Sequence, residues 1–72
     1  MSNELTERQK QILSRIKAFI RKRGFSPSVR DVAAENGMRS PNSAKSVLDA
    51  LQKKGFIRRD PKIARSIVLL QQ

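Results

Sequence analysis

Small hydrogen-bonding side chains gather in residues 40–54, SPNSAKSVLDALQKK. A helix turns by about 100° per residue. One face of a helix in this stretch, together with its flanks, would carry Asn42, Ser43, Lys45, Ser46, Asp49 and Lys53. Amide, hydroxyl and ammonium groups near the leading end of a helix are the groups that contact base edges of duplex DNA. The stretch therefore predicts a recognition helix, although Ser and Asn are also ordinary residues at the start of any helix.

The charge of the chain favours the recognition helix. Its 72 residues include 16 Lys and Arg against 6 Asp and Glu, which gives a net charge of +10. So many uncompensated charges repel one another in a folded domain, and this indicates an acidic partner. We expect that partner to be nucleic acid, with an anionic membrane surface as the alternative.

Catalysis finds no support in the composition. The chain has no Cys and no His, which excludes thiol chemistry, zinc fingers and His-based catalysis. Its six carboxylates form no paired set, and so small a chain cannot enclose a substrate pocket. We therefore expect no enzyme, no metal and no cofactor. No apolar run approaches the roughly 20 residues of a membrane span and no signal-peptide core precedes the first charges, so we expect a cytoplasmic protein.

Local signals predict three helices, each with an N-cap residue before it and a glycine after it. The helices are expected over 7–23, 29–36 and 41–54, with caps at Thr6, Ser28 and Ser40 and stops at Gly24, Gly37 and Gly55. The turn from Gly37 to Arg39, between the second and third helices, matches a helix-turn-helix. Apolar residues at helical spacing mark the inward faces. They are Ile12, Leu13, Ile16, Phe19 and Ile20, then Val32 and Ala33, then Ala44, Val47, Leu48 and Leu51.

The pattern changes after Gly55 to that of a β-hairpin. Residues 56–59 and 66–70 are rich in β-branched and aromatic side chains, and Asp60-Pro61 marks a turn between them. The basic loop from Asp60 to Arg65 would project as a wing. The expected fold is mostly α with a small β-hairpin (α+β): a winged helix-turn-helix, with three helices followed by a two-stranded wing. One domain is expected over residues 1–72, with a linker beginning near residue 71.

Three finer interpretations concern single side chains. Asp49 is expected to pair with Lys45 or Lys53 one turn away on its own helix. Arg58 and Arg59 alternate across a strand, so only one of them would face DNA and the other would lie in solvent. The three aromatic rings, Phe19, Phe25 and Phe56, are expected in the core, because three scattered rings cannot form a track for single-stranded nucleic acid.

Several motifs match a known pattern. The most specific is Arg39-Ser40-Pro41-Asn42-Ser43-Ala44 at the entry to the expected recognition helix. The others are Leu5-Thr6-x-Arg8-Gln9, Ser26-Pro27-Ser28-Val29-Arg30-Asp31, Leu48-x-Ala50-Leu51-x-Lys53-Lys54-Gly55 and Ile57-Arg58-Arg59-Asp60-Pro61. With these motifs, nearly all of the chain resembles the N-terminal DNA-binding domain of the LexA family, the bacterial SOS-response repressors.

The resemblance implies sequence-specific binding to double-stranded DNA and transcriptional repression of DNA-damage (SOS) response genes. The third helix would enter the major groove, and the wing would lie on the backbone or in the minor groove. Carried over position by position, base contacts fall on Ser40, Asn42, Ser43, Lys45 and Ser46. Contacts with the DNA backbone or minor groove are expected from Ser28, Arg30, Arg39, Lys53, Lys54, Arg58, Lys62 and Arg65.

The family resemblance also implies partners, some of which bind through a C-terminal domain rather than through the DNA-binding domain. LexA proteins bind a palindromic operator as homodimers, mainly through a C-terminal domain that cleaves its own linker with a Ser-Lys dyad when RecA filaments form. No such domain follows in these 72 residues, so the chain is expected to be a fragment of a longer repressor or a stand-alone relative. The well-known enterobacterial members have two acidic residues where this chain has Lys45 and Ser46. Its operator should therefore differ, because a lysine favours a guanine edge or a phosphate.

Two alternatives to sequence-specific binding remain open at this point. A winged helix can serve as a protein-docking module, which would require an exposed apolar patch on the third helix or the wing. The basic chain can also bind DNA without sequence preference. The location implied by the family is the cytoplasm, in association with the bacterial nucleoid.

Overall fold

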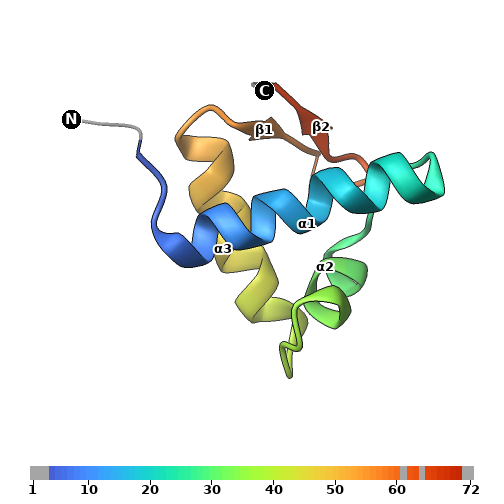
Figure 1. Ribbon diagram of the computed structural model, residues 1–72, viewed down its shortest axis with the longest axis horizontal. Helices are drawn as coiled ribbons and strands as arrows, with labels where there is room; N and C mark the ends of the chain where they lie inside the picture. The colour runs from blue at the N-terminus through green and yellow to red at the C-terminus, as the bar shows by residue number, and fades with distance from the viewer. Residues whose placement is uncertain (1–3, 61, 64, 71–72) are drawn as a thin grey trace.

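The computed structural model describes residues 4–60, 62–63 and 65–70, and this part of the chain forms three helices followed by two short strands (Figure 1). The order is α1 (Glu7–Arg23), α2 (Val29–Glu35), α3 (Pro41–Lys53), β1 (Ile57–Arg58) and β2 (Val68–Leu69). Helix α1 lies across α3, with α2 beside the start of α3 and the hairpin beside its end (Figure 1). This arrangement confirms the predicted winged helix-turn-helix fold.

The helix starts are fixed by side chains close in sequence. Thr6 Oγ1 accepts a hydrogen bond from the Gln9 backbone N–H, and Gln9 Oε1 accepts one from the Thr6 N–H, both at 3.1 Å. Ser28 and Asp31 make the same reciprocal pair at the start of α2, again at 3.1 Å. Each such N-cap stabilises its helix by about 1 kcal/mol. The sequence signals for these caps are confirmed.

Three glycines, Gly24, Gly37 and Gly55, take the left-handed backbone conformation after the ends of the three helices, and Gly55 has φ 86°. Gly24 has φ 80° and donates its N–H to the Ile20 carbonyl at 2.8 Å, which closes α1. Gly37 has φ 66° in the turn between α2 and α3. A residue with a Cβ pays a steric penalty there. The turn that sets the angle between the two helices therefore depends on Gly37.

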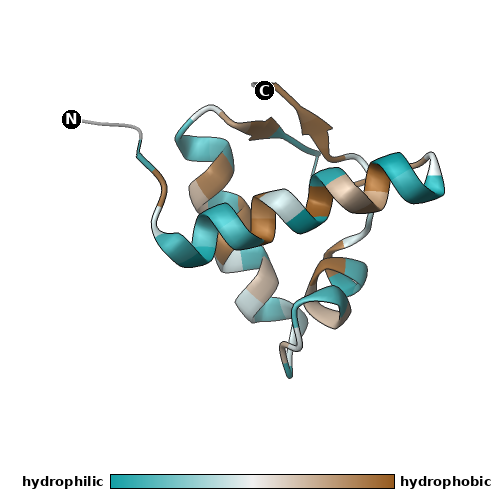
Figure 2. Ribbon diagram, in the orientation of Figure 1, coloured by the Kyte–Doolittle hydropathy of each residue, from teal (hydrophilic) through white to brown (hydrophobic). Residues whose placement is uncertain are grey.

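The core lies where the three helices and the hairpin meet. Figure 2 shows apolar residues alternating with hydrophilic ones along α1, and apolar residues in β1 and β2. The buried apolar residues are Ile12, Leu13, Ile16 and Phe19 of α1, Val32 and Ala33 of α2, Ala44, Leu48 and Leu51 of α3, and Ile57 and Ile67 of the hairpin. Ile20, Val47 and Phe56 are partly buried against them. The predicted inward faces are thus confirmed.

One aromatic prediction is wrong. Phe25 was expected in the core, but it is 46% exposed and packs edge-on against Phe19, with 5.7 Å between the ring centroids. Phe25 lies in the loop after Gly24, where the chain has already left the inward face of α1. Helical periodicity no longer decides which way a side chain points once the helix has ended.

The hairpin is shorter than the sequence indicated. β1 and β2 pair antiparallel over two residues each, with Ile57 opposite Leu69 and Arg58 opposite Val68. Beyond them, side chains replace the backbone ladder. Ser66 Oγ accepts from the Asp60 N–H and donates to the Asp60 carbonyl, both at 2.9 Å.

The backbone N–H of Ile67 donates to Ser26 Oγ in the loop before α2, at 2.9 Å. Backbone groups that bond side chains in this way are lost to strand pairing, and this explains the two-residue strands. Pro61, in the predicted turn, and the linker expected near residue 71 lie outside the described residues.

Candidate DNA-binding surface

The outer face of α3 is exposed over its first two turns. Asn42, Ser43, Lys45 and Ser46 occupy the first two turns, opposite the buried Ala44 side of the helix. In the described part of the chain, none of these four side chains makes a hydrogen bond or an ion pair. The structure thus brings together four of the five residues from which base contacts are expected.

Ser40, the fifth of these residues, already has a structural task. Its hydroxyl accepts from the Asn42 backbone N–H at 3.0 Å, and its side chain is half-buried. Pro41 occupies the first turn of the helix, where its lack of a backbone N–H costs no hydrogen bond. Ser40 therefore fixes where α3 begins and hence the direction in which the residues after it point.

The two lysines at the end of α3 differ in their surroundings. Lys53 is exposed in the last turn. The Lys54 ammonium instead donates to the Glu4 carbonyl at 2.9 Å and to Gln9 Oε1 at 2.8 Å. Because the acceptors lie just before α1 and in its first turn, Lys54 joins the end of α3 to the start of α1.

Arg59 is held against α3. Its Nη2 lies 2.9 Å from Asp49 Oδ1, and its side chain is only 7% exposed. Arg59 Nε is buried without a hydrogen-bond partner among the described residues. A buried guanidinium depends on its one carboxylate partner more than a solvated one does.

This pair corrects two interpretations of the sequence. Asp49 pairs with Arg59 rather than with Lys45 or Lys53 one helical turn away. Arg58 is the exposed member of the two adjacent arginines, but Arg59 is not in solvent as expected. The strand alternation was read correctly, and its inward side faces α3 instead of water.

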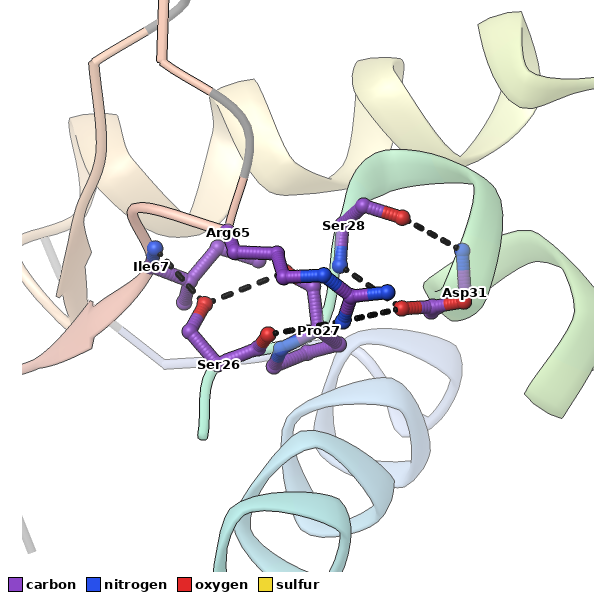
Figure 3. A network of polar contacts seen from close by, with 6 residues as sticks. All are labelled: Ser26, Pro27, Ser28, Asp31, Arg65 and Ile67. Atoms are coloured by element: carbon purple, nitrogen blue, oxygen red, sulfur yellow. Dashed lines mark hydrogen bonds and ion pairs between the residues drawn. The ribbon is translucent and has the colours of Figure 1, made fainter. Parts of the chain in front are cut away.

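Arg65 is also turned toward the helices. Its Nη1 lies 2.7 Å from Asp31 Oδ2 and donates to the Ser26 carbonyl at 3.2 Å (Figure 3). Its guanidinium carbon lies 4.9 Å from the centroid of the Phe25 ring, a cation–π contact. All three partners belong to the loop before α2 or to the first turn of α2.

These contacts lower the pKa of the Asp31 carboxyl. The backbone hydrogen bond from Ser28 holds the pKa of its carboxyl below the ordinary value of 3.8, opposed by partial desolvation and assisted by the charge of Arg65. A hydrogen bond to the ionised carboxylate and a nearby cation both favour the charged form. Asp31 is therefore ionised at neutral pH, as both its cap and its ion pair require.

The remaining basic residues of the predicted contact set are exposed, and none of them makes an ion pair within the described ranges. They are Arg30, Arg39, Lys53, Arg58 and Lys62. A cleft of about 580 Å³ lies between the wing and the start of α2, and its lining includes Arg30, Arg59, Lys62 and Arg65. Several cations around a concave surface attract anions more strongly than the same charges spread apart.

The sequence missed the two ion pairs that hold the wing. Asp49 and Arg59 are 10 positions apart, and Asp31 and Arg65 are 34 apart, so neither pair has the i±3 or i±4 spacing of a helical contact. The one signal available in the sequence was the small number of acidic residues, because a carboxylate in so basic a chain is expected to form an ion pair with one of many cations. It does not say which cation is chosen.

No helix among the described residues is long and apolar enough to cross a bilayer. The arrangement as a whole is a helix whose first two turns expose hydrogen-bonding side chains that have no partner among the described residues, followed by a basic wing. Donors and acceptors of this kind at a helix start can contact base edges, and cations on either side can contact phosphates.

Comparison with known proteins agrees with this geometry. Residues 2–66 match the family model described as the LexA DNA binding domain. Proteins named LexA repressor are similar over nearly the whole chain. That of Caldicellulosiruptor saccharolyticus is 39% identical over 97% of the chain, that of Thermosipho africanus 45% over 96%, and that of Mycobacterium leprae 42% over 93%.

The chain spans about a third of the length of these curated relatives, with 35%, 34% and 28% of their respective lengths covered. The family-model match covers all three helices and the wing as far as Ser66. From its family match, its fold and its exposed helix α3, this chain belongs to the LexA DNA-binding domain family.

Proposed function

We propose that this chain reads a specific sequence in duplex DNA and serves a transcriptional repressor of DNA-damage genes. The observation that carries the proposal is the outer face of the first two turns of α3, where Asn42, Ser43, Lys45 and Ser46 are exposed and their side chains have no partner in the described structure. A helix-turn-helix protein places the leading end of its second helix in the major groove. Here that leading end belongs to α3.

Two side chains are the strongest candidates for reading bases. The Asn42 amide can donate to and accept from adenine at once, which discriminates by about 1–3 kcal/mol against other bases. Lys45, one turn further along α3, can donate to the acceptor edge of a guanine. Ser43 and Ser46 supply shorter hydroxyls beside them.

The phosphate contacts are assigned to the cations that the protein leaves unpaired. There are five of them in the described part of the predicted set: Arg30, Arg39, Lys53, Arg58 and Lys62. Neutralising about five phosphates per monomer gives a log–log salt slope of roughly −4 to −5. A slope near −1 would contradict this assignment.

Repression would use two copies of the domain. One monomer contacts one half-site, so tight binding requires a palindromic operator with half-sites about one or more helical turns apart. In a full-length relative we expect the second copy to come from a homodimer formed outside these residues, where a response to RecA filaments would also act. The working location would be the cytoplasm, on nucleoid DNA.

The protein-docking alternative has less support. It requires an exposed apolar patch on α3 or the wing. The exposed large apolar residues in the described structure are Phe25, Ile63, Val68 and Leu70, none of them in α3. Ile63 lies in the wing loop and Val68 in β2, so the wing exposes apolar side chains whereas α3 exposes no large one.

The test is selection from a randomised duplex pool, read by fluorescence anisotropy at about 50 and 200 mM salt. We expect an enriched palindrome whose enrichment is lost in Asn42→Ala and in Lys45→Ala. Lys22→Ala is the matched control, because Lys22 is an exposed cation on α1, away from the outer face of α3.

Binding without an enriched motif would leave a basic protein without sequence preference. No binding at either salt concentration would overturn the proposal and favour the protein-docking function instead.

A further inference from the structure

The second arm of the wing, residues 65–67, contacts the loop before α2 and the first turn of α2 through Arg65 and Ile67. Arg65 reaches Asp31 and the Ser26 carbonyl through its side chain, while the Ile67 backbone N–H donates to Ser26 Oγ at 2.9 Å (Figure 3). Between them, the Ser66 hydroxyl bonds the N–H and the carbonyl of Asp60 in the opposite arm. Arg65 and Ile67 thus hold the wing to the region around the start of α2, and Ser66 holds the two arms of the wing together.

The backbone conformation of Arg65 also indicates that the contacts of its side chain contribute to holding the wing in place. It has φ 58°, and among the described residues it is the only one other than glycine with a positive φ. A side chain in this left-handed conformation is sterically penalised, and glycine would avoid the penalty. The contacts of the guanidinium with Asp31, Ser26 and Phe25 offset that penalty.

The wing cations fall into two groups. Arg65 is neutralised by Asp31, whereas Arg58 and Lys62 are exposed and make no ion pair within the described ranges. A cation that already has a carboxylate 2.7 Å away must break that pair before it can bind a phosphate. The cations best placed to meet a phosphate are therefore Arg58 and Lys62.

We propose that Arg65 is a positioning residue for the wing: its ion pair with Asp31 fixes the wing against α2 so that Arg58 and Lys62 meet the DNA backbone. The inference rests on the proposed DNA binding. It departs from the expectation that Arg65 itself touches DNA, and it assigns Asp31 a role in DNA affinity although Asp31 is acidic.

The two roles of Arg65 predict opposite effects of Asp31→Asn. The asparagine carbonyl can still accept from the Ser28 N–H, so the cap of α2 is kept while the charge is removed. If Arg65 positions the wing, D31N loosens it and lowers DNA affinity. If Arg65 contacts DNA, D31N frees it from a competitor and raises DNA affinity.

The measurement is the anisotropy of the selected duplex over a range of salt, below the melting temperature of every variant. Glu35→Gln is the control for D31N, because it removes an equally charged, exposed carboxylate from the other end of α2. Relative to E35Q, we expect D31N to bind about two- to fivefold more weakly, as suits an ion pair that is partly exposed.

Lys62→Met is the control for Arg65→Met, since each removes one wing cation. We expect K62M to reduce the magnitude of the log–log salt slope by about 0.9 and R65M to weaken binding with the slope unchanged. Arg65→Gly suits the left-handed backbone and should behave like R65M, which keeps the test valid if methionine disturbs the fold. Arg65→Lys keeps the charge and should restore part of the affinity. The double variant D31N/R65M should be no weaker than R65M.

A measurement without DNA separates this inference from the proposed function. Hydrogen exchange at the Ile67 amide should be faster in R65M and D31N than in K62M and E35Q, because that amide bonds Ser26 beside the ion pair. An unchanged exchange rate would overturn the positioning role even if the protein binds DNA. Stronger binding by D31N than by E35Q, or a salt slope reduced equally in R65M and K62M, would overturn it in favour of a direct DNA contact.

Discussion

The outer face of α3 and the wing are both basic, but they use their cations differently. Lys45 on α3 is exposed and has no partner in the described structure. In the wing, Arg59 and Arg65 are each paired with a carboxylate of the helix-turn-helix, Asp49 and Asp31 respectively. A count of basic residues alone therefore overstates how many wing cations lack a carboxylate partner.

The two wing pairs also differ from each other. Arg59 is 7% exposed and its neighbour Asp49 is 59% exposed, so the cation needs its partner more than the carboxylate does. Arg65 and Asp31 are 46% and 31% exposed, and solvent screens their attraction. The comparison teaches that burial, rather than the number of ion pairs, decides which pair stabilises the fold.

The largest effect is expected from reversing the charge of Lys45, the exposed cation near the start of α3. Lys45→Glu should lower affinity for the selected wild-type site about 10- to 100-fold, because a carboxylate cannot donate to a guanine edge and repels phosphate. Selection with K45E should return sites with cytosine at the affected position, since a carboxylate accepts from the cytosine amino group. Unfolding in urea should change by less than about 0.5 kcal/mol. Equal affinity of K45E and wild type would place Lys45 outside the interface.

The next effect concerns stability rather than binding. Asp49→Ala leaves the buried guanidinium of Arg59 without its carboxylate, and we expect a loss of about 1–3 kcal/mol in the free energy of unfolding. Urea denaturation measures it, with Lys53→Ala as the control on the same helix. If D49A and K53A unfold alike, the Arg59 pair contributes nothing despite its burial.

A smaller loss of stability is expected from the serine that replaces part of the strand ladder. Ser66→Ala removes two hydrogen bonds with Asp60 and should cost about 1 kcal/mol. Ser46→Ala, on the free face of α3, should leave stability unchanged and weaken binding to the selected site. Melting temperature and anisotropy together test this contrast, which fails if the two variants show the same profile.

The smallest effect is a dependence of stability on pH. Because contacts in the folded state lower the pKa of Asp31, with the Ser28 N–H as the main cause, the folded state favours the ionised form. This stability is present above the ordinary pKa of 3.8 and is lost as the pH falls through the lower folded-state pKa. Urea unfolding from about pH 5 to about pH 2 should show a shallower decline in D31N than in wild type or E35Q. Parallel declines in all three would mean that Asp31 makes no such contribution.

Local signals in the sequence were enough to place the helices. Thr6, Ser28 and Ser40 cap the helix starts, and Gly24 and Gly37 take the left-handed conformations that end α1 and turn the chain after α2. These features depend on residues no more than four positions apart, so they can be read along the chain. The exposed face of α3 follows from the same periodicity that buries Ala44, Leu48 and Leu51.

Only the tertiary structure decided where the wing cations point. The ion-pair partners of Asp49 and Asp31 could not be predicted from the sequence, because they lie 10 and 34 positions away. Ion pairs between distant residues follow no regular spacing along the chain. The orientation of Arg59 depends on how β1 packs against α3, and that of Arg65 on a left-handed backbone at a residue that is not glycine. The sequence alone determined which polar residues α3 exposes, and packing determined which wing cations have no ion pair in the described structure.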